Sequence, residues 1–144
     1  MQTQELISQS GACGPARRLT LREAQALAPG LLQSAQACYD EWDESDVDTY
    51  AGGGICHLIA DALVEILQAA GIDAQTTSSS FEQHVYVICQ LAEGVYSLDI
   101  PYRLYEVGSM FTWSKISDVT FDASSLDWFR IDADPDRFEE YLEH

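Results

Sequence analysis

Apolar positions in the first half of the chain follow the period of a helix. Between residues 55 and 70 they recur at intervals of three and one, which predicts a helix with one buried face formed by Ile55, Leu58, Ile59, Ala62, Leu63, Ile66, Leu67 and Ala70. We expect Gly71 to end this helix as a C-cap. Two more helices are predicted upstream, over residues 20–27 and 30–42. A Thr-Leu-Arg-Glu sequence with capping-box spacing begins the first of them, and Pro29 stops it.

The second half of the chain changes to the period of strands. His84–Gln90 and Val95–Ile100 are short and rich in β-branched and aromatic residues, so we expect a β-hairpin with Leu91–Gly94 as its four-residue loop. Weaker strand patterns cover residues 111–113 and 119–121. Because helical patterns precede strand patterns, the chain predicts an α+β fold, with helices packed on an antiparallel sheet, rather than an alternating α/β fold.

The length of 144 residues predicts a single domain over residues 1–144. Residues 1–18 are expected to form a polar, irregular arm, because glycines and a proline interrupt any helix there. Residues 72–75 suggest a short strand or connector, and residues 76–80 a polar loop. A last helix is predicted over residues 136–142, after a proline that can start it.

Composition and charge restrict the classes of partner. Apolar residues make up 47% of the chain, enough for a core that needs neither disulfides nor metal. Seven Lys and Arg residues stand against 24 Asp and Glu residues, giving a net charge of −17. Such a charge disfavours nucleic acid and anionic membranes. The simplest interpretation is a solvated acidic surface, and a cationic partner is tolerated better than an anionic one.

The cysteines and the N-terminal segment bear on the cellular compartment. Four cysteines, Cys13, Cys38, Cys56 and Cys89, form no CxxC pair and no regular framework. The N-terminal residues lack the apolar core of a signal peptide, and no stretch reaches the length of a membrane span. We therefore expect a reduced, cytoplasmic protein, with export by a signal-less route left open.

Cys56 is the candidate nucleophile. It lies in the first turn of the predicted helix at residues 55–70, where unpaired backbone N–H groups and the helix dipole favour an anion. This position is a known way to activate a thiol. Three glycines, residues 52–54, precede it and leave room for a substrate backbone to approach the sulfur. Buried cysteines are common in cores, so the structural interpretation stands beside the catalytic one.

A thiolate needs a group that accepts and returns a proton, and histidine suits neutral pH. His84 begins an apolar strand that must pack on the Cys56 helix, whereas His57 points away from Cys56 and His144 is terminal. Asp99 lies in the second hairpin strand, and the register set by the four-residue loop places it on the same sheet face as His84. It is therefore the candidate that orients the base, although an ion pair with Arg103 is the alternative.

The sequence offers candidates for an oxyanion hole but none for a metal site of good geometry. The backbone N–H of Cys56 is the first oxyanion donor, Tyr50 and Gln36 are candidates for the second, and Gly54 is a candidate for substrate contact. Cys56, His57, His84 and Cys89 could surround zinc only from a helix start and both faces of one strand. That geometry is poor, and the acidic run at residues 40–48 lacks the order of a calcium loop, so we expect no metal and no cofactor.

Together these residues resemble a known family. The sequences Gly54-Ile55-Cys56, Ala60, Ala62-Leu63, Leu67, Gly71-Ile72-Asp73-Ala74, His84 and Gly94-Val95-Tyr96-Ser97-Leu98-Asp99 are similar to the core of transglutaminase-like cysteine enzymes of the papain-like superfamily. Gly53-Gly54-Ile55-Cys56 also resembles arylamine N-acetyltransferases. The resemblance covers residues 52–101. It implies a papain/transglutaminase-like fold with a Cys opening a helix and a His and an Asp on successive strands.

The function that follows is thiol-dependent acyl transfer. We expect hydrolysis of an amide or isopeptide bond, as in a cysteine peptidase or amidase, or transfer of the acyl group to an amine, and the sequence leaves both open. The substrate would be a peptide or protein, preferably cationic. The alternative is a non-enzymatic acidic binding protein of the immunity, inhibitor or decoy type on the same fold. Reactivity of the Cys56 thiol separates the two.

Overall fold

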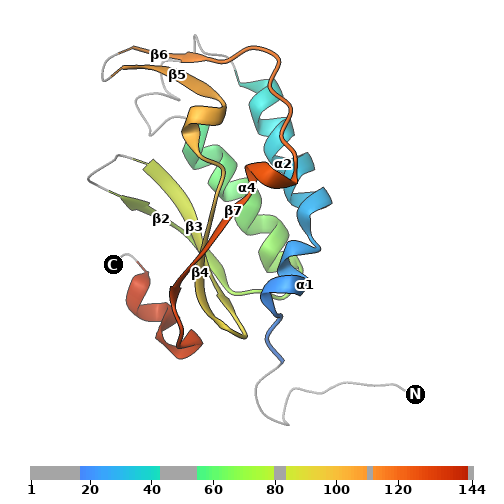
Figure 1. The fold of residues 1–144 in the computed structure, drawn as a ribbon, viewed down its shortest axis with the longest axis vertical. Helices are drawn as coiled ribbons and strands as arrows, with labels where there is room; N and C mark the ends of the chain where they lie inside the picture. The colour runs from blue at the N-terminus through green and yellow to red at the C-terminus, as the bar shows by residue number, and fades with distance from the viewer. Residues whose placement is uncertain (1–16, 43–54, 80–83, 110–111, 143–144) are drawn as a thin grey trace.

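The fold was analysed in a computed structural model, which describes residues 17–42, 55–79, 84–109 and 112–142. Helices lie against one face of an antiparallel sheet, and a small hairpin closes one end of the molecule (Figure 1). The α+β class is thus confirmed. No helix among the described residues is long and apolar enough to cross a membrane.

The helices begin and end where local sequence signals place them. Helix α1, Leu21–Gln25, is capped by Thr20, and the predicted capping box with Glu23 is present. Helix α2, Ala28–Glu41, starts two residues before the prediction. Its proline lies in the first turn, where a missing N–H costs no hydrogen bond. Helix α4, Ile55–Ala69, ends before Gly71, whose φ of 91° suits glycine.

A four-stranded sheet has the order β2-β3-β4-β7, with every neighbouring pair antiparallel. Its strands are β2, β3, β4 and β7, with the bounds Ala74–Ser79, His84–Leu91, Gly94–Asp99 and Asp127–Asp132. The polar loop predicted at residues 76–80 is wrong, because most of it belongs to β2. This strand lies at the sheet edge, where polar Thr and Ser side chains are tolerated while the backbone pairs with β3.

The β3–β4 hairpin has the predicted register, with Gln90 opposite Val95, but a shorter loop. Leu91 pairs with Gly94, so only the two residues between them form the turn. Gly94 has a φ of 149°, and a Cβ there would collide with the Asp132 carbonyl of β7. The close approach of a third strand at the turn therefore selects glycine at this position.

The remaining elements are a second hairpin and short 3-10 helices. Strands β5, Glu106–Ser109, and β6, Thr112–Lys115, form a separate hairpin, and β6 overlaps the strand predicted at residues 111–113. Residues 119–121 are not a strand, contrary to prediction. The last helix exists, but as a 3-10 helix, η3, Pro135–Tyr141. Two shorter 3-10 helices are η1, Tyr102–Leu104, and η2, Ala123–Ser125.

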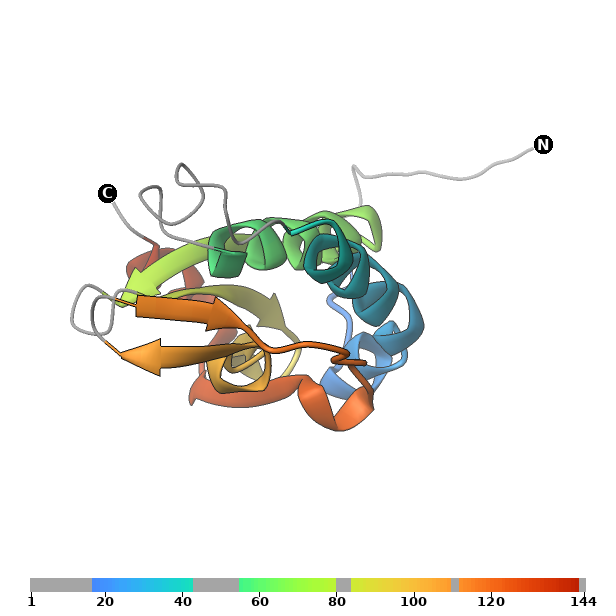
Figure 2. The same ribbon diagram turned by 90° about the horizontal axis from the view of Figure 1, so that it is seen from above.

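Two apolar clusters hold the layers together. The larger lies between the helices and the facing side of the sheet, where Leu63 and Leu67 of α4 and Val87, Cys89 and Leu98 of the sheet are buried in the same cluster. The smaller lies on the opposite face, where η3 covers the sheet with Ile88, Val95 and Phe138. The N-terminal end of α4 lies at the end of the molecule that carries the β5–β6 hairpin, which is nearest the viewer in Figure 2.

Candidate active site

The sulfur of Cys56 lies in the first turn of α4, at the edge of the larger core cluster. Cys56 is the second residue of the helix and is 7% exposed, whereas Cys89 in β3 is fully buried. Cys38 of α2 is half-buried, and its thiol donates to the Leu58 carbonyl at 3.7 Å. Cys56 therefore lies on the buried side of α4. Its place in the first turn also puts it where the helix dipole favours a negative charge.

His84 and Asp99 meet through the hairpin register. His84 is the first residue of β3 and Asp99 the last of β4. The Nε2 atom of His84 lies 3.0 Å from both carboxylate oxygens of Asp99, so a protonated Nε2 donates to the carboxylate. The two residues are diagonal neighbours on one sheet face, as the sequence predicted. The alternative ion pair between Asp99 and Arg103 does not form in the described part of the chain.

The two strands stop pairing just before they reach this pair of side chains. The β3–β4 ladder ends at Val87 opposite Leu98, so the first three residues of β3 pair only with β2. Asp99 in turn pairs with Asp127 of β7. The backbones of β3 and β4 are therefore not joined where His84 and Asp99 lie, and their side chains make the contact instead.

Cys56 completes the group of three. Cys56 acts on the His84 imidazole as Asp99 does, and each of the two residues raises the pKa of His84. Because Nε2 faces Asp99, Nδ1 is the ring nitrogen left for the sulfur. Burial, the largest single effect, lowers the pKa of His84, but the hydrogen bonds and charges of Asp99 and Cys56 together outweigh it and raise the pKa to about 10. His84 therefore keeps its proton at neutral pH.

Two tyrosine rings fix the orientation of the His84 imidazole. The Tyr86 ring stacks on it, with centroids 6.5 Å apart and planes inclined by 19°. The Tyr102 ring of η1 lies at 5.7 Å and 57°. His84 itself is 8% exposed. Such packing restricts the ring to one rotamer, so that each nitrogen faces a defined partner.

Tyr105 and Glu106, which follow η1, bring two more polar groups to the site. Tyr105 is fully buried, and its hydroxyl has no hydrogen-bond partner among the described residues. Burial, and then the charges of Cys56 and Asp99, raise the pKa of Tyr105, so the phenol stays neutral. The sequence indicated Tyr105 only as one of many aromatic residues. It gave no signal at all for Glu106, which is partly buried within electrostatic range of His84.

The predicted oxyanion and substrate residues do not gain support from the structure. Tyr50 and Gly54 lie outside the described residues. Gln36 donates to the carbonyl of Val119 and to the carboxylate of Asp40, and its amide oxygen accepts from the Phe121 N–H. Both ends of the Gln36 amide thus fix the segment before η2 against α2, and its donors are already used.

His57 lies on the exposed side of α4, away from the buried face of the helix. His57 is exposed and lies 3.3 Å from Asp61 one helical turn on, as expected of a surface residue. In the part of the chain that the structure describes, no three His, Cys, Asp or Glu side chains cluster as a metal site.

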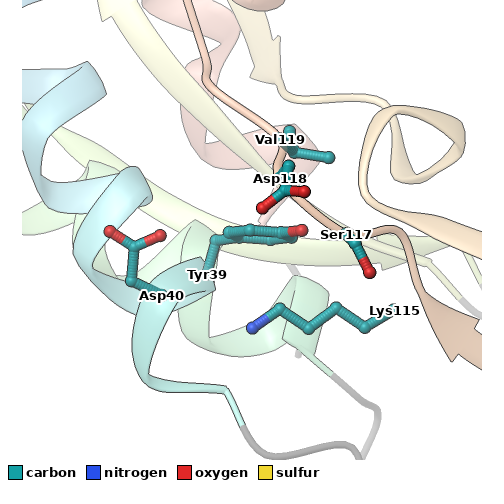
Figure 3. A pocket seen from close by; sticks show the side chains of 6 residues that line it. All are labelled: Tyr39, Asp40, Lys115, Ser117, Asp118 and Val119. Atoms are coloured by element: carbon teal, nitrogen blue, oxygen red, sulfur yellow. The ribbon is translucent and has the colours of Figure 1, made fainter.

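A hollow of about 350 Å³ lies beside α2 and includes none of the three site residues. It is lined by Tyr39, Asp40, Lys115, Ser117, Asp118 and Val119 (Figure 3).

No protein-family model, curated protein or solved structure matches this chain. The arrangement of His84 and Asp99, and the effect of Cys56 on His84, are therefore the features that bear on function.

Proposed function

We propose that this protein is a thiol enzyme that transfers acyl groups, with Cys56 as nucleophile, His84 as proton carrier and Asp99 as the residue that orients His84. The observation that carries the proposal is the hydrogen bond of His84 Nε2 with Asp99, together with the effect of Cys56 on the same imidazole, whose pKa both residues raise. This is the order of groups that a thiol-based acyl transfer requires. It also agrees with the resemblance to transglutaminase-like and papain-like enzymes.

The protonation of His84 defines the resting state of the proposed centre. An imidazolium beside a thiol stabilises the thiolate, which is the nucleophilic form. His84 has then already taken the proton of Cys56 before the substrate arrives. Asp99 stabilises the imidazolium charge, and the first turn of α4 favours the negative charge on sulfur.

The reaction proceeds in two halves. The Cys56 thiolate attacks the substrate carbonyl carbon, and the carbonyl electron pair moves to oxygen, which the Cys56 N–H can stabilise. When the tetrahedral intermediate collapses, the leaving amine takes the His84 proton and a thioester remains on Cys56. Water or an acceptor amine then gives a proton to His84 and attacks the thioester. Collapse of this second intermediate releases the acid or the new amide and expels the Cys56 thiolate, while His84 keeps the proton, so that the ion pair is restored.

A chromogenic ester tests this proposal without knowledge of the natural substrate. With p-nitrophenyl acetate, we expect a rapid release of nitrophenolate equal to one equivalent of protein, followed by slower turnover. Peptide mapping of the quenched protein should place one acetyl group on Cys56, and a Cys56→Ser variant should lack both the burst and the mapped acetyl group. If the acetyl group spreads over lysines, or no burst occurs, the acidic binding protein becomes the better account.

A further inference from the structure

Glu106 lacks the partner that its strand pairing offers. It stands directly opposite Lys115 in the β5–β6 hairpin, where opposite charges normally pair. Lys115 instead extends alongside the Tyr39 ring toward α2 (Figure 3). Its ammonium donates to the Trp42 carbonyl at 3.1 Å and lies 4.4 Å from the centroid of Tyr39. The hairpin is thereby anchored to α2, and the carboxylate of Glu106 is left without the lysine.

The surroundings of Glu106 favour a positive charge. The side chain is partly buried, and among the described residues its carboxylate has no hydrogen bond and no ion pair. Burial raises the pKa of Glu106, and the charge of His84 opposes this effect. A partly desolvated carboxylate of this kind gains most from a cationic group that supplies the missing hydrogen bonds.

The charges of the groups around the Cys56 sulfur also favour a cationic ligand. The Cys56 thiolate and the His84 imidazolium cancel, which leaves the charges of Asp99 and Glu106. The carboxylate of Asp99 is hydrogen-bonded to His84, so the carboxylate of Glu106 is the negative group that can still bind a cationic ligand. Glu106 immediately follows Tyr105, which lies within electrostatic range of Cys56. The 3-10 helix η1, which precedes Tyr105, carries the Tyr102 ring that packs on His84.

We propose that Glu106 is a specificity residue that binds an alkylammonium or guanidinium group of the substrate next to the carbonyl that Cys56 attacks. This inference rests on the proposed function and adds the substrate class, an acyl compound that carries a positive charge. The net charge of −17 would also favour the approach of such a substrate.

Charged thiol reagents measure the field at the sulfur without a known substrate. Methanethiosulfonates exist as a cationic trimethylammonium-ethyl reagent, an anionic sulfonato-ethyl reagent and a neutral methyl reagent. In each, the Cys56 thiolate attacks the sulfenyl sulfur, a disulfide forms and methanesulfinate leaves. The ratio of the cationic to the anionic rate at Cys56, followed by peptide mapping, reports the local charge.

Glu106→Gln should lower this ratio about three- to tenfold at low salt, because one negative charge near the sulfur is lost. Glu139→Gln, which removes the same charge from an exposed position in η3, should change the ratio less than about twofold. Glu106→Asp keeps the charge and should keep most of the ratio. Circular dichroism of each variant verifies folding, and Glu106→Ala, which also removes the charge, carries the comparison if Glu106→Gln unfolds.

Two outcomes overturn the inference in different ways. If Glu106→Gln shifts the ratio no more than Glu139→Gln does, or if the ratio in Glu106→Asp falls to that of the uncharged variant, Glu106 does not bind the cation, while the thiol centre stands. If wild-type Cys56 fails to react even with the neutral reagent, the proposed function fails, and the assignment of Glu106 fails with it.

Discussion

Replacing His84 by alanine is expected to lower the turnover of p-nitrophenyl acetate by about 10²–10⁴-fold, the usual contribution of a general acid–base group. The loss should fall on both halves of the reaction. Attack on the ester slows because the Cys56 thiolate loses the imidazolium that stabilises it, and hydrolysis of the thioester slows because water loses its base. The size of the nitrophenolate burst and the rate of the later turnover should therefore both fall, as followed by stopped-flow absorbance.

His57→Ala is the matched control, because His57 is the neighbour of Cys56 on α4 but is exposed and paired with Asp61. We expect its turnover to stay within about twofold of the wild type, as for most exposed substitutions. Equal losses in the two variants would show that the helix start, rather than the imidazole of His84, controls the thiol.

Asp99→Ala is expected to lower the same turnover by about 10²-fold, because the orienting acceptor and the charge that stabilises the imidazolium are both lost. Asp99→Asn should fall between this variant and the wild type, since its amide oxygen still accepts from Nε2 but carries no charge. Adding Asp99→Ala to His84→Ala should cost little more, since the two residues act as one unit.

Asp127→Ala serves as the control for Asp99, because Asp127 is exposed on β7 and directly opposite Asp99. Its turnover should remain close to that of the wild type. A full additional loss in the His84 and Asp99 double variant would mean that the two residues act independently, contrary to the hydrogen bond between them.

The pairing of His84 with Asp99 could be predicted because it depends on strand parity. A strand has a period of two, so fixing Gln90 opposite Val95 fixes which residues share a face. The loop length was wrong by two residues, but the register survived, since Leu91 and Gly94 extend the same ladder. Contacts set by a local period are thus accessible from sequence.

Other parts of the site depend on contacts that have no local pattern. Strand β7 was missed because it is an edge strand whose exposed charged residues hide the alternation. The position of Glu106 depends on where η1 ends and on Lys115 turning toward Trp42. The role of Gln36 in holding the segment before η2 depends on a contact 83 residues away along the chain. These contacts join residues that are far apart in the sequence, so they depend on how the elements pack and not on a local sequence pattern.

The pH dependence of iodoacetamide labelling at each cysteine tests the central claim most directly. Burial, and then the nearby acidic residues, raise the pKa of Cys38, and burial raises the pKa of Cys89 to about 12. A raised pKa keeps both as unreactive thiols at neutral pH, even though Cys38 is more exposed than Cys56. The proposed mechanism requires Cys56, in contrast, to react as a thiolate at neutral pH.

The account predicts that Cys56 is labelled at least about tenfold faster than Cys38 at pH 6–7, because the raised pKa keeps Cys38 almost wholly in its unreactive thiol form there. It also predicts that Cys38 approaches this rate only in alkaline solution. Labelling of Cys38 as fast as, or faster than, Cys56 at neutral pH would show that exposure alone governs reactivity. It would contradict the presence of an activated thiol.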